Sequence, residues 1–74
     1  MNAQRVWQEL CQGYNEQDWK TVKQRAEDLI GWLQQEGKPP RITRELANAF
    51  SNKVIALAVC RKMLREANRR TKEV

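Results

Sequence analysis

Four basic side chains near the C-terminal end form the clearest chemical pattern in this chain. They recur at i, i+1, i+4 and i+8, so a helix would carry them along one side: Arg61, Lys62, Arg65 and Arg69. Clustered cations on one surface are what the phosphate groups of a polyanion require. A solvated helix surface has the same composition, and no helix-turn-helix signature or Gly-rich loop accompanies the cluster. The pattern therefore predicts either a polyanion-binding face or a surface that only keeps the helix soluble.

Other reactive side chains are sparse. The chain has no histidine and only two cysteines, Cys11 and Cys60. A zinc site needs three or four ligands, so we expect no metal. The adjacent carboxylates Glu27 and Asp28 fall on a polar helix face with no nucleophile motif, so we expect no catalytic residue, no cofactor and no enzymatic activity. Both cysteines fall beside apolar stripes, which predicts reduced and at least partly buried thiols.

Length and charge limit the class of protein. A chain of 74 residues is one small domain, 1–74. Residues 1–37 carry four basic and six acidic side chains (net −2), and residues 38–74 carry ten basic and three acidic ones (net +7). No apolar run approaches the roughly 20 residues that span a membrane, and the first residues lack the apolar core of a signal peptide. We therefore expect a soluble, cytoplasmic protein with no membrane contact.

Apolar side chains at helical spacing predict an all-α fold of three helices. The predicted helices cover about 3–12, 19–35 and 44–68, followed by a frayed basic tail at 69–74. Asn2, Asp18 and Thr43 are the expected N-terminal caps. Gly37 is expected after the second helix, and the first helix is expected to end either at Gly13 or, running through it, at Tyr14 or Asn15. The short first connection predicts an antiparallel hairpin of the first two helices, covered by the longer third helix.

The first part of the chain resembles a tetratricopeptide repeat. The stretch Trp7-x-x-Leu10-Cys11-x-x-Tyr14 is similar to the first helix of such a repeat, and the similarity continues through these residues: Asp18, Trp19, Val22, Ala26 and Pro39. It covers a single unit of about 34 residues, where these repeats otherwise occur in arrays. The resemblance implies a helical hairpin and a protein-binding role.

The third helix carries two apolar stripes. The first is expected to close over the hairpin and contains Leu46, Phe50, Val54, Leu57, Leu64 and Ala67, with Cys60 at its edge. The second contains Ile55, Val59 and Met63 at i, i+4 and i+8. Three helices cannot cover both stripes, so the second predicts a homodimer interface through the third helix. Trp32, at the edge of the second helix's stripe, predicts either a contact with a protein partner or packing under the third helix.

Together these patterns favour a non-catalytic helical interaction module that self-associates. The alternative is a small nucleic-acid-binding or nucleoprotein accessory factor that uses the basic end of the third helix. A third interpretation is a monomer whose second apolar stripe is docked by a larger protein partner. Salt dependence separates the first two, because binding to phosphates weakens steeply with salt and apolar association does not.

Overall fold

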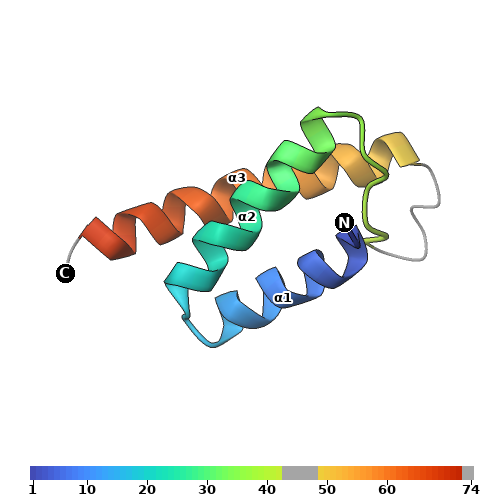
Figure 1. Cartoon of the computed structure of the whole chain (residues 1–74). Helices are drawn as coiled ribbons and strands as arrows, with labels where there is room; N and C mark the ends of the chain where they lie inside the picture. The colour runs from blue at the N-terminus through green and yellow to red at the C-terminus, as the bar shows by residue number, and fades with distance from the viewer. Residues whose placement is uncertain (43–48, 73–74) are drawn as a thin grey trace.

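Three helices make up the part of the chain that the structure describes, and this part contains no strand (Figure 1). The computed structural model describes residues 1–42 and 49–72, with side chains from Ser51 onward in the second range. Helix α1 runs over Ala3–Asn15, α2 over Trp19–Gln34 and α3 over Ala49–Lys72. The all-α prediction is confirmed, while the expected cap Thr43 and the expected start of the third helix at 44 lie outside the described residues.

Side-chain caps begin the first two helices, as predicted. The side-chain oxygen of Asn2 accepts a hydrogen bond from the backbone N–H of Arg5 at 3.1 Å. The Asp18 carboxylate accepts one from the backbone N–H of Thr21 at 3.3 Å and a second from the Thr21 hydroxyl at 2.7 Å. Each cap satisfies a backbone donor that has no partner inside its own helix, which fixes where the helix begins.

Helix α1 runs through Gly13 and ends at Asn15, which is the later of the two ends that the sequence allowed. Gly13 is buried inside the helix, and a Cβ added there would lie 3.3 Å from Thr21 Cγ2. The terminal turn instead places Gln17 in the left-handed region, at φ 58°. The backbone N–H of Asp18 then donates to the carbonyl of Gly13 at 2.8 Å, which closes a Schellman motif. The glycine is therefore used for close contact between α1 and α2.

Helix α2 ends in the same motif. Glu36 has φ 65°, and the backbone N–H of Gly37 donates to the carbonyl of Trp32 at 2.9 Å. Gly37 lies one residue beyond the left-handed position, where the Trp32 indole leaves no room for a Cβ. The Nε1–H of Trp32 donates to the carbonyl of Lys38 at 2.9 Å. Trp32 therefore holds the segment that follows α2 in place through these contacts with Gly37 and Lys38.

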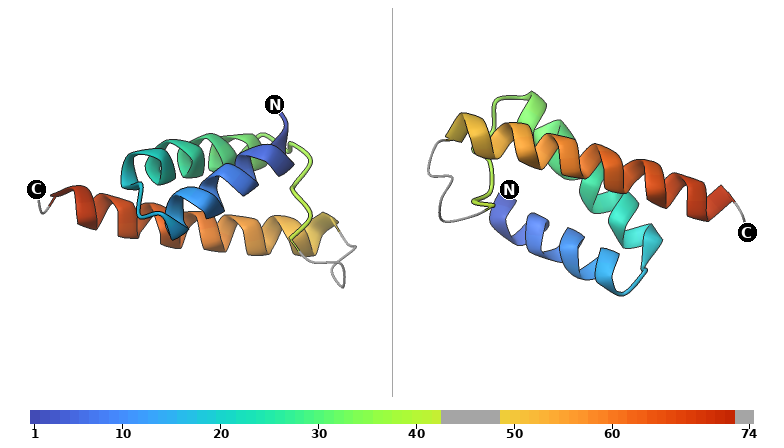
Figure 2. Two further views of the ribbon diagram at one scale, coloured as in Figure 1. Left: turned by 90° about the horizontal axis from the view of Figure 1, so that it is seen from below. Right: turned by 180° about the vertical axis from the view of Figure 1, so that it is seen from behind.

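Helix α2 is the central element of the fold, because α1 and α3 each pack mainly against it. Helices α1 and α2 lie antiparallel, and both lie on the same side of α3 (Figure 2). Two hydrogen bonds hold residues 38–42 against the helices. The Gln4 side chain accepts one from the backbone N–H of Arg41 at 2.8 Å, and the side chain of the buried Asn52 accepts the other from the backbone N–H of Ile42 at 3.1 Å. The buried apolar core comprises Ala3, Val6, Leu10, Val22, Ala26, Leu29, Leu33, Ala56, Cys60 and Ala67.

The two apolar stripes predicted for α3 are not two separate faces. Small side chains along the middle of one broad face are buried, namely Ala56, Cys60 and Ala67. Larger side chains on both sides of this strip are partly buried against the same core, namely Leu57, Met63 and Leu64. The prediction that Val54 belongs to the core stripe is wrong, because its side chain is 49% exposed. Small residues at the centre allow a close approach of the helix, so residues from both stripes reach the core.

The end of α3 also differs from prediction, because residues 69–72 are helical. Glu66 accepts hydrogen bonds from Arg69 at 2.7 Å and from Arg70 at 2.9 Å. The Arg70 guanidinium lies 5.6 Å above the ring of Trp19, which makes an edge-to-face contact with Tyr14 at 5.4 Å. These contacts tie the last turns of α3 to the start of α2.

Candidate functional site

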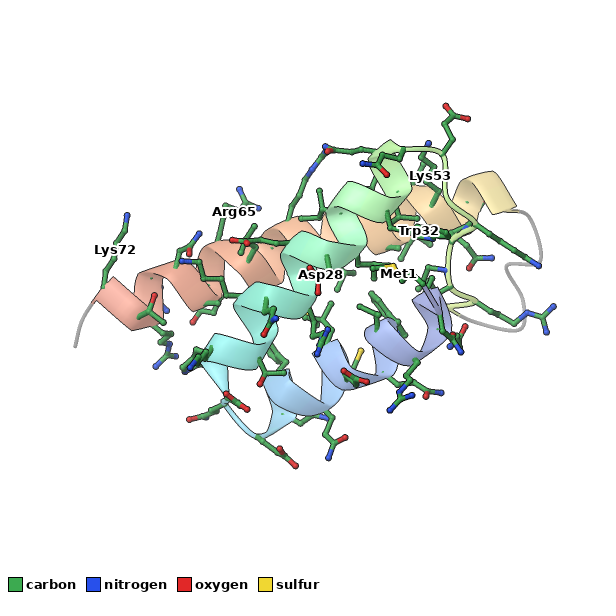
Figure 3. All side chains as sticks on the ribbon, in the orientation of Figure 1. Met1, Asp28, Trp32, Lys53, Arg65 and Lys72 are labelled. Carbon is green, nitrogen blue, oxygen red and sulfur yellow. The ribbon has the colours of Figure 1, made fainter. Side chains whose placement is uncertain are left out.

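The exposed side of α3 carries a row of basic side chains that we call the cationic face, namely Arg61, Lys62, Arg65, Arg69 and Lys72. At 3.6 residues per turn and 1.5 Å rise per residue, they lie within an arc of about 100° and along about 16 Å of the axis. All five side chains are exposed. Figure 3 shows Arg65 and Lys72 pointing away from α1 on the same edge of α3. The structure therefore brings the four predicted cations together.

Lys72 was missed by the sequence analysis because the tail was expected to fray. Its membership depends on the helix continuing through Arg69 and Arg70, whose ion pairs with Glu66 hold the last turns in place. The i+7 spacing from Arg65 returns Lys72 to the same side of the helix. The run of basic residues after position 68 was the available signal, since cations are favourable in the last turn of a helix.

Charge is poorly balanced on this face. Arg61, Lys62 and Arg65 form no ion pair with any residue that the structure describes. The acidic residue at the edge of the face is Glu66, and hydrogen bonds from Arg69 and then Arg70 lower its pKa to about 2. Glu66 thus stays ionised and is already matched by two arginines. The remaining cations are available to an anion from outside the chain.

The carboxylates considered for catalysis take part in ordinary surface ion pairs or remain exposed. Arg25 contacts Glu9 at 3.0 Å and Asp28 at 3.2 Å, which links α1 to α2. Arg5 contacts the same Glu9 at 3.2 Å. Glu27 is exposed on α2. Among the described residues, no group of three or more His, Cys, Asp or Glu side chains is placed to hold a metal ion.

The residues predicted for self-association have unequal positions. Met63 is partly buried and packs against the core, whereas Ile55 and Val59 are half-buried on α3. The more exposed apolar side chains are Val54 and Ala58. They continue the line of the cationic face toward the start of α3, since both fall in the same arc. The exposed apolar surface of α3 is therefore short and adjoins the cations.

Trp32 lies at the end of α2, partly buried against the core and beside Met1 in Figure 3. Trp32, the first four residues of the chain, Lys38 and Arg41 line a cavity of about 630 Å³. The tryptophan is thus partly buried against the chain that leaves α2, at Gly37 and Lys38. Its predicted alternatives, a protein contact or packing under the third helix, stay predictions.

The two cysteines are free, and Cys60 is buried while Cys11 is partly buried, as predicted. Burial, with a smaller contribution from the nearby Cys11, raises the pKa of Cys60 to about 12. Burial also raises the pKa of Cys11. Because the thiolate is the reactive form, both groups are poor nucleophiles at neutral pH.

No helix of the described residues is long and apolar enough to cross a bilayer. Comparisons of the chain with protein families, with curated proteins and with solved structures find no match.

Proposed function

We propose that this chain is a non-catalytic module that binds phosphate-rich polyanions through the cationic face of α3. The observation that carries the proposal is the alignment of five exposed basic side chains, of which Arg61, Lys62 and Arg65 have no acidic partner among the described residues. A basic stripe along one helix, in a domain whose isoelectric point is about 9.7, is typical of a nucleic-acid-binding surface.

The distribution of charge over the molecule also supports this proposal. The excess of positive charge lies in residues 38–74, while residues 1–37 have a slight acidic excess. A polyanion approaching from solution would be attracted to α3 and not to the outer side of the hairpin. Such steering raises association rates at low salt and fades as salt screens the charges.

Charge reversal on the face tests the proposal. The variant carrying Arg61→Glu and Arg65→Glu should lose at least about tenfold in affinity for a labelled nucleic acid at low salt. Two positive charges become negative where phosphates would bind, which lowers the net charge by about four units. The matched control carries Lys20→Glu and Lys23→Glu, the same charge change at exposed positions of α2. Fluorescence anisotropy measures binding, and circular dichroism checks that both variants fold.

Two outcomes would refute the proposal. Absence of binding by the unmodified chain at micromolar concentration in low salt would show that the cations only solvate the helix. An equal loss of affinity in the α2 control would show that net charge, and not the face, determines binding.

A second candidate function is self-association through the start of α3, with binding of a protein partner as its variant. It is favoured by the exposure of Val54, at 49%, next to the exposed Ala58 and the half-buried Ile55 and Val59. The packing of Met63 against the core removes one member of the interface predicted from sequence, which leaves a smaller patch than a stable dimer normally uses.

Light scattering over a range of concentrations tests self-association. If the patch pairs two copies, the unmodified chain should approach twice its monomer mass, and Val54→Asp should return it to a monomer without unfolding it, because the side chain is exposed. The control Gln24→Asp places the same new charge on the exposed side of α2. A chain that stays monomeric at high micromolar concentration would exclude self-association.

A further inference from the structure

The aromatic side chains that the structure describes lie away from the cationic face. Trp19 makes an edge-to-face contact with Tyr14 and lies below the Arg70 guanidinium. Trp7 is partly buried against the core. Trp32 covers Gly37 at the far end of α2. Among the side chains that the structure describes, the exposed arc of α3 therefore offers no ring on which an unpaired base could stack.

Proteins that hold single-stranded nucleic acid commonly stack its bases on aromatic side chains. Each base stacked on an aromatic ring contributes about 1–3 kcal/mol, and proteins that bind single strands combine such rings with a basic groove. The cationic face has the charges without the rings. Its interactions with a nucleic acid are therefore limited to contacts with the phosphates and to a groove that is wide enough to admit the helix.

The shape of α3 suits a duplex groove. The helix is continuous over Ala49–Lys72, and its last turns extend past the turn that joins α1 and α2 in both Figure 1 and Figure 2. The major groove of B-DNA is about 12 Å wide and admits an α-helix. Because the hairpin lies on the opposite side of α3, the basic turns can approach a groove without obstruction by the rest of the chain.

Charge density favours the duplex as well. Over the roughly 16 Å that the five cations occupy, a duplex presents about nine phosphates at one per 1.7 Å, whereas one strand presents about five. The arc of about 100° spreads the cations to two sides of the helix, with Arg61 and Lys62 at its two limits. Two sides of a helix lying in a groove meet the two phosphate walls of that groove.

We propose that the cationic face binds double-stranded nucleic acid through its phosphates, in preference to single strands and with little dependence on sequence. This inference rests on the proposed function, since it specifies the polyanion that the same face would bind. The side chains that would hold it are Arg61, Lys62, Arg65, Arg69 and Lys72. For Arg69, a phosphate would compete with Glu66, because the Arg69 guanidinium also donates a hydrogen bond to that carboxylate.

The test compares a short labelled DNA duplex, a second duplex of unrelated sequence and one isolated strand by fluorescence anisotropy. The duplexes should bind at least about fivefold more tightly than the strand and within about twofold of each other. With four to five phosphate contacts, the slope of log K against log salt should be about −3.6 to −4.5. Affinity for the duplex should then fall about 150- to 500-fold between about 50 mM and 200 mM salt.

A single neutral substitution locates the contact. Arg65→Gln should make the salt slope shallower by about 0.9, because one phosphate contact is removed. Lys23→Gln, on the exposed side of α2, should leave the slope unchanged. Both substitutions remove one charge at an exposed position, so circular dichroism should show the same helical content for both.

The outcomes separate this inference from the proposed function. If the isolated strand binds as tightly as the duplex, or if the two duplexes differ more than tenfold, the preference for double-stranded phosphates is wrong while polyanion binding stands. If Lys23→Gln changes the slope as much as Arg65→Gln, the assignment to α3 is wrong. If no nucleic acid binds at low salt, both proposals fall.

Discussion

Replacing Gln17 with glycine should stabilise the fold, because Gln17 occupies the left-handed region at φ 58° after α1. The Schellman motif needs this conformation for the hydrogen bond from the N–H of Asp18 to the carbonyl of Gly13 at 2.8 Å. A side chain with a Cβ is disfavoured there, since the Cβ crowds the backbone, and glycine has no such atom. Gln17 is exposed and its side chain makes no hydrogen bond with the described residues, so its removal costs few contacts.

Two opposing terms set the size of the effect. The left-handed conformation costs a residue with a Cβ about 1–2 kcal/mol. Glycine recovers that cost and loses about 0.5–1 kcal/mol through its greater freedom in the unfolded chain. At the midpoints of these two ranges, the net gain in the free energy of unfolding is about 0.75 kcal/mol. A domain of this size gains about 4–8 °C in Tm per kcal/mol, so the melting temperature should rise by about 3–6 °C.

Thermal unfolding followed by circular dichroism at 222 nm measures the change, with urea unfolding as a second measure of stability. The matched control is Gln17→Ala, which removes the same polar group and keeps the Cβ. Alanine should leave Tm within about 2 °C of the unmodified chain. If the glycine variant were no more stable than the alanine variant, the left-handed conformation at position 17 would not carry the cost that we assign to it.

Three further predictions concern other contacts. Gly37→Ala should destabilise the fold by about 1–3 kcal/mol and shift tryptophan emission, because a Cβ would overlap the Trp32 indole; unchanged emission and stability would contradict the contact. Stability should fall as pH rises from 9.0 toward about 12, because the unfolded chain ionises a Cys60 thiol that the fold keeps protonated; urea unfolding should show this slope, and Cys60→Ala should reduce it. The stabilising ion pairs of Glu66 should be lost as pH falls from 4.5 to about 2, so ellipticity at 222 nm should decline in this window in the unmodified chain and less in Glu66→Gln.

The sequence was sufficient for features that depend on near neighbours in the chain. The caps Asn2 and Asp18 act on backbone groups three residues ahead, so their pattern could be recognised without knowing the fold. The spacing of apolar residues predicted three helices, because a helix places i, i+3 and i+4 on one side. The cluster of basic residues after position 60 was visible for the same reason.

Only the tertiary structure determined which side of α3 is buried. The hydrophobic effect is non-directional and depends on the apolar area that is buried. From the sequence alone, either apolar stripe of the helix could therefore pack against the core. The small residues Ala56 and Cys60 allow α3 to pack closely against α2, which draws Met63 inward and leaves Val54 in solvent. Because this side of α3 faces the core, the basic residues on its other side are exposed together. Which side faces the core depends on contacts between residues far apart in the chain.

The ends of the helices were decided in the same way. The sequence predicted glycine at the left-handed positions, and the structure places Gln17 and Glu36 there instead. Gly13 allows α1 to approach Thr21, and Gly37 leaves room for the Trp32 indole. Local backbone preferences do not predict either of these contacts. Local preferences give the energetic cost of a left-handed backbone conformation for each residue type. The packing of the three helices determines which residues adopt that conformation.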